Sequence, residues 1–125
     1  MNKVNVQESP ILRDGVDISS PVKTRPVHEI FDNAAARFPL RPCLDFLGRI
    51  YDYKTIAEQI DRTAEGFKQL GVRKGDKVGL CLPNTPYYVV CYYAILKCGG
   101  VVVNFDPLYA KREIAYQIED SGCRL

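Results

Sequence analysis

VGLCLPNTPYYVVCYYAILKCGGVVVNF, residues 78–105, is the stretch that decides the fold of this chain. It predicts a strand over 78–82, a helix over 86–98 and a second strand over 101–105. Lys97 is the one charged residue of that helix, which is therefore apolar on all sides and requires burial on more than one of them. The second strand is a non-alternating apolar run, typical of a parallel strand covered on both faces. Together these elements predict one right-handed βαβ unit.

Both ends of the predicted helix carry boundary signals. Asn84 or Thr85 is expected to cap it, and Pro86 to occupy its first turn. The pair Gly99-Gly100 follows the last turn and indicates a helix cap and a tight turn rather than a phosphate site, because the carboxyl end of a helix dipole repels phosphate. The segment LPNTP, Leu82–Pro86, precedes the helix N-terminus and is the alternative place for a phosphate, although it contains no glycine.

A first helix is predicted upstream, starting near Pro26 and ending before Pro39. Its apolar residues recur at three- and four-residue steps and predict one buried face. They are Val27, Ile30, Phe31, Ala34 and Phe38. His28, the one histidine, is interpreted as a residue of the helix surface.

CLDFLGRIYDY, residues 43–53, predicts a β-hairpin with Gly48-Arg49 as a type II′ turn. The next helix, TIAEQIDRTAEGFKQLG, begins at a cap for which the sequence offers two candidates. Asp52 is one, and Thr55 with Glu58 as a capping box is the other. Gly71 is expected just past its end.

A last helix is predicted from about Tyr109 to Asp120, with Ile114 and Ile118 on its core face and Gly122 as its C-terminal cap. Cys123-Arg124-Leu125 then resembles the opening of another strand. These elements are too few to cover both faces of a parallel sheet, and we expect the helix over 86–98 to lack packing partners. The missing partner is either more of the same chain or another subunit, and the apolar surface from Tyr87 to Cys98 could support a homo-oligomer.

Composition and charge exclude several classes of protein. The chain has 125 residues, the size of one domain, and a formal net charge of +2, too small to indicate nucleic-acid binding. Its five cysteines show no CxxC spacing, so a zinc site or disulfide framework is not expected. They are interpreted as buried thiols of a reducing compartment, and we expect a cytoplasmic protein for which peripheral membrane contact stays open. Residues 1–23 are expected to form a disordered or draped tail.

No motif for catalysis or phosphate binding occurs. GxxxxGK[ST], GxGxxG and GxSxG are all absent. The carboxylates Asp106, Glu113, Glu119 and Asp120 are interpreted as caps and solvated helix faces. The tyrosines of the central helix are interpreted as packing residues rather than a base-stacking platform, because no basic residues interleave with them; they are Tyr87, Tyr88, Tyr92 and Tyr93.

Four segments, in order and with conserved spacing, resemble the N-terminal part of AMP-forming acyl-CoA synthetases of the adenylate-forming superfamily. RFPLRPCLDF resembles the family phrase RFPDRPAL, and YDYKTIAEQIDRTAEGFKQLGVRKGDKVGLCLPN resembles TYAEL…A…L…GV.KGDRVAL..PN. AILKCGGVVVNFDPLY is similar to AILKAGGVVVNVNPLY, and REIAYQIEDSGCRL to RELEHQLNDSGA, which leads into a strand in the family. The closest similarity is to bacterial long-chain fatty acid–CoA ligases. Asp106 stands where the fatty acyl branch has asparagine and is common in peptide-synthetase adenylation domains, whereas Val101–Phe105 favours the fatty acyl branch.

The resemblance implies an α/β fold, a partial three-layer arrangement with a short parallel sheet, a β-hairpin and flanking helices. Residues 24–125 would be the N-terminal subdomain of a larger adenylation domain, packing against the rest of that domain. The implied enzyme activates a fatty acid with ATP and Mg²⁺ to an acyl-adenylate and transfers the acyl group to coenzyme A.

The family's phosphate loop, YGxTE-like motif, ribose-binding aspartate and C-terminal lysine have no matching positions here. The sequence therefore predicts no catalytic, cofactor-binding or metal-binding residue in this chain, and an inactive piece to which no cofactor binds. Two alternatives remain: a stand-alone interaction or regulatory module derived from the family, and an unrelated small nucleotide-binding domain.

Overall fold

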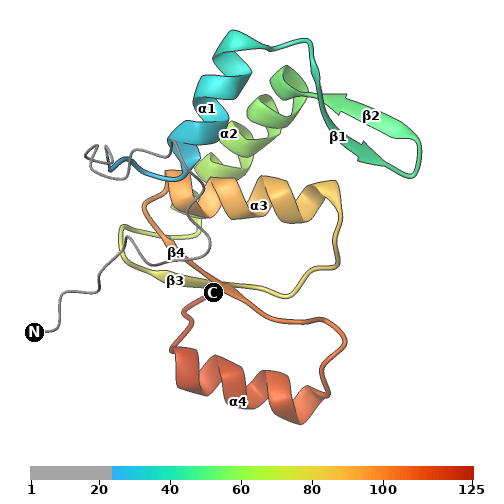
Figure 1. Cartoon of the computed structure of the whole chain (residues 1–125). Coiled ribbons are helices and arrows are strands. Elements are labelled where there is room, and N and C mark those ends of the chain that lie inside the picture. Colours follow the sequence, from blue (N-terminus) through green and yellow to red (C-terminus); the bar gives the residue numbers. More distant parts are fainter. Residues whose placement is uncertain (1–23) are drawn as a thin grey trace, which may run out of the picture.

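The computed structural model describes residues 24–125, so the tail predicted for residues 1–23 lies outside the described residues. Helices and strands follow one another along the chain as Figure 1 shows. They are α1 (His28–Arg37), β1 (Pro42–Phe46), β2 (Arg49–Asp52), α2 (Tyr53–Gln69), β3 (Lys77–Leu80), α3 (Pro86–Lys97), β4 (Val101–Asn104) and α4 (Lys111–Ser121).

The predicted βαβ unit is present. β3 and β4 are parallel neighbours, paired from Lys77 with Val101 to Leu80 with Asn104, and α3 connects them. Both strands end earlier than predicted: β3 ends at Leu80 rather than at residue 82, and β4 ends at Asn104 rather than at Phe105. Phe105 still extends the ladder, since its N–H donates to the Leu80 carbonyl at 2.9 Å.

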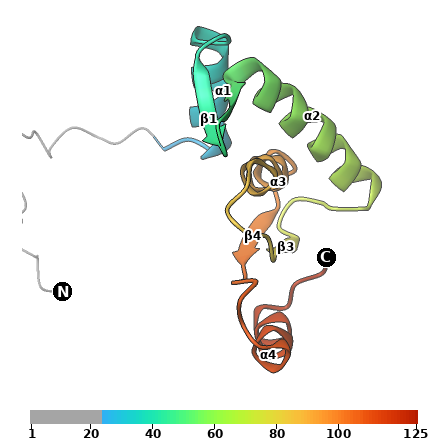
Figure 2. The same ribbon diagram turned by 90° about the vertical axis from the view of Figure 1, so that its right-hand side faces the viewer.

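α3 lies between two layers, with α1 and α2 on one side and the β3–β4 sheet on the other, as both views show (Figures 1 and 2). Toward the helices, Val90 and Ala94 join one buried cluster, whose other members are Phe31, Ile56, Ile60 and Ala64. Toward the sheet, Ile95 joins a second cluster with Val72, Val78 and Leu80. Each fully buried isoleucine contributes about 1.5–3 kcal/mol through the hydrophobic effect.

The prediction that this helix would lack packing partners is therefore wrong. Elements that precede it in the chain bury one side, and the two strands it connects bury the other. Tyr87 is its one exposed residue. The apolar surface expected from Tyr87 to Cys98 as a homo-oligomer contact is thus largely inside the described structure.

The apolar face predicted for the first helix is only partly buried. Phe31 is 7% exposed and packs against Tyr53 and Tyr93, with ring centroids 5.5 and 5.0 Å apart. Val27 and Ile30, on the same predicted face, are exposed. A three-to-four residue period shows which side chains share a face, but the width of the neighbouring element decides how many of them are covered.

The β1–β2 hairpin turns one residue earlier than predicted. Phe46 pairs with Arg49, so the two central turn residues are Leu47 and Gly48 rather than Gly48 and Arg49. Their φ angles are 52° and 79°, and two positive values in sequence are those of a type I′ turn, not type II′. The Asp45 carboxylate accepts a hydrogen bond from the Gly48 N–H at 3.1 Å and stabilises this turn.

Asp52 caps α2, which decides between the two candidates that the sequence offers. Its carboxylate accepts a hydrogen bond from the Thr55 N–H at 2.7 Å. Hydrogen bonds from Thr55 hold the pKa of Asp52 below its ordinary value, because they favour the charged carboxylate.

α4 lies on the face of the sheet opposite α3 (Figures 1 and 2), and none of its residues is fully buried. Ile118, predicted on a core face, is exposed, and Ile114 is half-buried. Gly122, with φ of 66°, ends the helix as predicted. The helix is attached to the sheet by the Lys77 ammonium, which donates to the Ser121 carbonyl at 2.7 Å.

The segment after α4 runs along β3. The Arg124 N–H donates to the Lys77 carbonyl at 2.9 Å, and the Gly79 N–H donates to the Leu125 carbonyl at 2.8 Å. On the other edge of β3, the Asp76 carbonyl accepts from the Val101 N–H and the Leu80 carbonyl accepts from the Phe105 N–H. The two edges use different residues of β3 because backbone groups point alternately to either side along a strand. The segment therefore occupies the edge of β3 opposite β4, where the sequence predicts the opening of a strand. None of the helices among residues 24–125 has the length and apolar character needed to span a bilayer.

Candidate functional site

An open groove lies at the carboxyl ends of β3 and β4, the place where open parallel sheets usually bind ligands. Its volume is about 630 Å³. The loop after β3, the loop after β4, the first turn of α3 and one residue of α4 form its walls. The lining residues are Leu82, Pro83, Asn84, Tyr88, Asn104, Phe105, Asp106, Pro107, Leu108, Tyr109 and Gln117.

Four polar side chains define the groove's chemistry. The Tyr88 hydroxyl donates to Asn104 Oδ1 at 2.8 Å and ties the start of α3 to the end of β4. The Asp106 carboxylate accepts a hydrogen bond from the Leu108 N–H at 2.9 Å, so it shapes its own loop. Gln117 Oε1 is buried and has no hydrogen-bond partner among the described residues.

The lining residues provide no charge that would hold a phosphate. None of them is lysine, arginine or histidine, and Asp106 would repel an anion. Asn84, from the alternative phosphate segment, lies in this wall, but α3 begins at Pro86, which has no N–H to offer. No group of His, Cys, Asp and Glu residues suited to a metal ion occurs between residues 24 and 125. The groove is suited to packing against a neutral or apolar surface.

The glycine pair is a helix cap and turn, as predicted. Gly99 has φ of 76°, and its N–H donates to the Leu96 carbonyl at 2.9 Å. The Gly100 N–H donates to the Ile95 carbonyl at 3.0 Å. These bonds satisfy carbonyls at the end of α3, and no N–H of the pair is left to face an anion.

The tyrosines of α3 are mainly packing residues. Tyr93 packs on Phe31, and Tyr92 stacks on Tyr88 with ring centroids 6.2 Å apart. Tyr87 is exposed beside Arg62. It is the one tyrosine of the four that does not fit the prediction that they pack inside the structure. His28 is half-buried in the first turn of α1, and no cluster of metal ligands among the described residues includes it.

The five cysteines are free thiols. Burial raises the pKa of Cys43, Cys91 and Cys98, which keeps these three protonated and unreactive at neutral pH. The Cys98 thiol also donates to the Ala64 carbonyl at 3.2 Å. Cys81 is exposed, which corrects the prediction that all five are buried.

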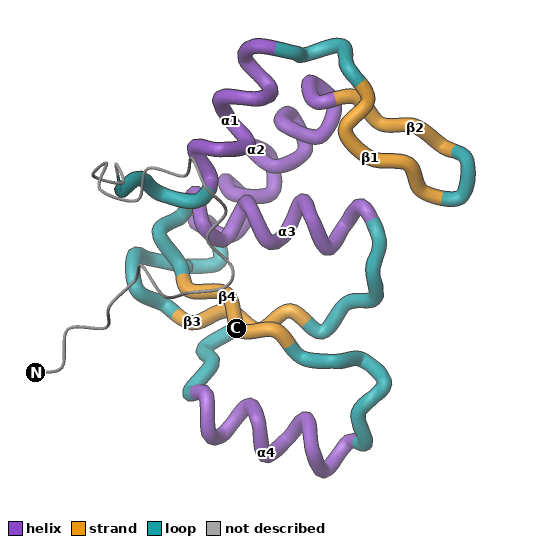
Figure 3. The backbone as a smooth tube through the Cα atoms, viewed as in Figure 1, coloured by secondary structure: helices purple, strands orange, loops and turns teal. Residues whose placement is uncertain are grey.

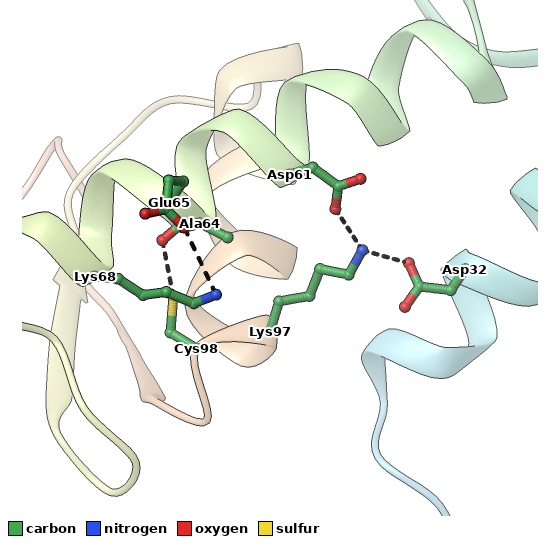
Figure 4. Close-up of polar contacts among 7 residues, drawn as sticks. All are labelled: Asp32, Asp61, Ala64, Glu65, Lys68, Lys97 and Cys98. Atoms are coloured by element: carbon green, nitrogen blue, oxygen red, sulfur yellow. Dashed lines mark hydrogen bonds and ion pairs between the residues drawn. The ribbon is translucent and has the colours of Figure 1, made fainter.

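Lys97 is the polar centre of the helical layer, and Figure 4 shows its contacts. Its ammonium lies 2.6 Å from Asp61 Oδ1 and 2.9 Å from Asp32 Oδ1, so it joins α3 to α2 and to α1. Burial disfavours the ammonium, but the hydrogen bonds to the two carboxylates outweigh burial and raise the pKa of Lys97. A single lysine in an otherwise apolar helix was the sequence signal for this site, but its partners are far away in the sequence.

Comparison with known proteins places this geometry in a family. The chain is 35% identical over 101 residues to a long-chain-fatty-acid–CoA ligase of Bacillus subtilis, an alignment that covers 81% of this chain and 18% of that protein. It is 36% identical over 104 residues to the ligase of the same name from Salmonella typhimurium, covering 82% of this chain. The chain thus spans 18% of the length of each of these relatives.

Solved structures have the same fold. The N-terminal subdomain of Klebsiella oxytoca NpsA superposes with a TM-score of 0.77 at 30% identity, over 81% of this chain and 26% of that one. NpsA in complex with 3-hydroxyanthranilyl-AMSN gives 0.79 at 29% identity, over 82% of this chain and 21% of that one. Residues 31–125 match the sequence profile of the family described as AMP-binding enzyme. The chain therefore belongs to the family of AMP-binding enzymes and has the fold of part of the N-terminal subdomain of an adenylation domain.

Proposed function

We propose that this chain is the N-terminal part of a fatty acid–CoA ligase that works through an acyl-adenylate. The observation that carries the proposal is the family match over residues 31–125, together with 35–36% identity to two ligases named for long-chain fatty acids. Identity to NpsA, which has been solved in complex with 3-hydroxyanthranilyl-AMSN, is 29–30%. The names of the two ligases favour a fatty acid over an aryl acid as the substrate.

The proposed reaction has two steps. A fatty acid carboxylate attacks the α-phosphorus of ATP, which forms the acyl-adenylate and releases pyrophosphate. The thiol of coenzyme A then attacks the acyl carbon, forms the thioester and releases AMP and a proton. Mg²⁺ would neutralise phosphate charge in the first step.

The role of this chain in the enzyme is to build a wall of the large domain. The βαβ unit positions the groove at the ends of β3 and β4, and the Lys97 contacts fix the helical layer behind it. The groove has a lining of both apolar and polar side chains and no cationic residue, which suits it to pack against the remaining domain. The five free thiols support placing the enzyme in the cytoplasm.

A chimeric enzyme tests the proposal. The segment of the Bacillus subtilis ligase that aligns with residues 31–125 is replaced by this chain, and AMP release is measured with a long-chain fatty acid, ATP, Mg²⁺ and coenzyme A. We expect AMP release that requires both the fatty acid and coenzyme A. Anthranilate in place of the fatty acid should be a poor substrate.

The control is a second chimera that carries the corresponding segment of the Salmonella typhimurium ligase, which this chain also resembles. Circular dichroism and elution volume establish that each chimera is folded. A folded but inactive chimera beside an active control would contradict the proposal.

A stand-alone interaction module is the second candidate, favoured by one observation: α3 is buried on both sides within the described chain. Such a module would fold without the rest of an adenylation domain. A cooperative, monomeric melting transition of the isolated chain, together with an inactive chimera, would favour this candidate.

A further inference from the structure

Gln117 of α4 carries a hydrogen-bond acceptor that no described residue satisfies. Its side-chain oxygen, Oε1, is buried, and no N–H or O–H group among residues 24–125 donates to it. Buried polar atoms of folded proteins nearly always have a partner, because an unpaired one has lost its hydration without compensation. The oxygen therefore indicates a donor outside the described part of the chain.

Gln117 contributes to the groove at the carboxyl ends of β3 and β4, and it is the one residue of α4 among the lining residues. The groove lies where the loops after these strands leave the sheet, one leading to α3 and the other to α4 (Figure 3). Two other acceptors of the lining already have donors: Asn104 Oδ1 accepts from Tyr88, and the Asp106 carboxylate accepts from the Leu108 N–H. Gln117 Oε1 is the buried acceptor of the groove that remains without one.

The helix that carries Gln117 is poorly covered. None of its residues is completely buried, and Tyr116 and Ile118, on either side of Gln117 in the sequence, are exposed. Leu108, in the loop that leads to the helix, is 90% exposed. Because a helix in a protein gains most of its stability from tertiary packing, α4 requires a covering element that residues 24–125 do not supply.

Two observations identify the rest of an adenylation domain as this cover. The superposition on the N-terminal subdomain of NpsA uses 81% of this chain but 26% of that one, so a subdomain of this fold contains much more chain than is described here. The segment after α4 also runs in the direction of β3, since its successive residues bond to Lys77 and then to Gly79. A chain that keeps this course reaches Leu82, which belongs to the groove wall.

We propose that the rest of the adenylation domain enters the groove along the edge of β3 and donates a hydrogen bond to Gln117 Oε1. This contact fixes the orientation of α4 against that domain, and the exposed apolar side chains around Gln117 are buried with it. The inference rests on the proposed function in one respect, that this chain is part of a larger adenylation domain. It does not depend on which acid the enzyme activates.

Gln117→Leu tests the contact in two settings, the chain alone and the chimera with the Bacillus subtilis ligase. Leucine is similar to glutamine in size but accepts no hydrogen bond. In the chain alone, Q117L should leave the melting temperature unchanged or raise it, because an unpaired acceptor is replaced by an apolar group. In the chimera, Q117L should shorten the half-life of the folded state at elevated temperature about fivefold, because a donor of the covering domain loses its acceptor.

Gln69→Leu is the matched control, since Gln69 is exposed at the end of α2. It should change stability in neither setting. Circular dichroism follows unfolding in every sample, so the comparison does not require AMP release. A folded chimera without AMP release would contradict the proposed function and would still report on Gln117.

An equal effect of Q117L in the two settings would overturn the proposal. A loss of stability in both would assign the donor to water or to this chain itself, and a gain in both would show that the oxygen has no donor in the larger domain. A chimera that does not fold, beside a folded Salmonella typhimurium control, would also overturn it, because the rest of the domain would then not fit this groove.

Discussion

Gly100, between α3 and β4, shows how one residue limits the packing of the whole unit. A Cβ atom at this position would lie 2.9 Å from Ile95 Cγ2 and 3.3 Å from the Asp76 carbonyl oxygen. Ile95 is fully buried in the cluster beneath the sheet. Neither neighbour has free space to move into, so the glycine is required for close approach rather than for a positive φ.

Gly100→Ala should destabilise the chain by about 1–3 kcal/mol, because the added methyl group overpacks the helix against the strand. Gly66→Ala is the matched control, since nothing lies within 4 Å of a Cβ atom in that half-exposed part of α2. It should stabilise the chain by about 0.5–1 kcal/mol through helix propensity. Urea unfolding measures both values, and equal effects of the two substitutions would contradict this account.

At the residue scale, sequence signals for backbone conformation were reliable at the ends of helices and not in the hairpin turn. The roles of Gly99 and Gly122 were predicted correctly, and Asp52 was one of the two candidate caps that the sequence offered for α2. The hairpin turn was misplaced because Gly48 was taken as the first central residue, as in a type II′ turn. Cross-strand pairing of Leu44 with Tyr51 and of Phe46 with Arg49 decides the register, and that pairing puts Leu47 in the turn.

At the element scale, α3 is held by one ionic contact as well as by its apolar faces. Lys97 joins α3 to Asp61 of α2 and Asp32 of α1, and its side chain is 24% exposed. The sequence indicated that this helix needs burial on several sides, and the structure confirms it. It did not indicate which elements supply that burial.

Lys97→Met should destabilise the chain by about 1 kcal/mol at neutral pH, because the half-buried Asp32 carboxylate and the exposed Asp61 carboxylate lose their shared cation. Lys68→Met is the control, since the Lys68–Glu65 pair is exposed and 3.9 Å apart, and its effect should be close to zero. Urea unfolding across a pH series measures both.

The pH dependence follows from the direction of the pKa shift. The folded pKa of Lys97 is raised, so its contribution is complete below the unfolded pKa, about 10.4, and is lost as the pH rises through the folded pKa. The difference between K97M and the unmodified chain should therefore shrink above about pH 10.4. A difference that is constant up to strongly alkaline pH would show that packing, not charge, is responsible.

At the scale of the whole molecule, the sheet is completed by residues that are far apart in the sequence. The segment after α4 returns to β3, and Arg124 adds an ion pair to Asp76 at 3.0 Å. These contacts and the hydrogen bond from Lys77 to the Ser121 carbonyl attach α4 to the sheet, since the helix itself buries no residue completely. The layer formed by α4 is therefore the least tightly packed part of the described chain.

Deletion of residues 123–125 should expose the edge of β3. The Gly79 N–H loses its acceptor, the Leu125 carbonyl, and its hydrogen exchange should accelerate about tenfold or more. The Phe105 N–H, which donates to the Leu80 carbonyl on the other edge, is the internal control and should stay protected. Unchanged exchange at Gly79, measured by NMR, would show that the end of the chain does not pair with β3 in solution.

The sequence by itself determined the order of the elements, the βαβ unit and the family, because each depends on local patterns: apolar periodicity, caps and glycines, and motifs in a fixed order. It also indicated that Lys97 is unusual. Only the tertiary structure decided that α1 and α2 cover α3, that Leu47 is the exposed turn residue, and that the end of the chain lies along β3. The physical reason is that burial and strand pairing are set by neighbours distant in the sequence, whereas propensity and capping are set by neighbours within one or two turns.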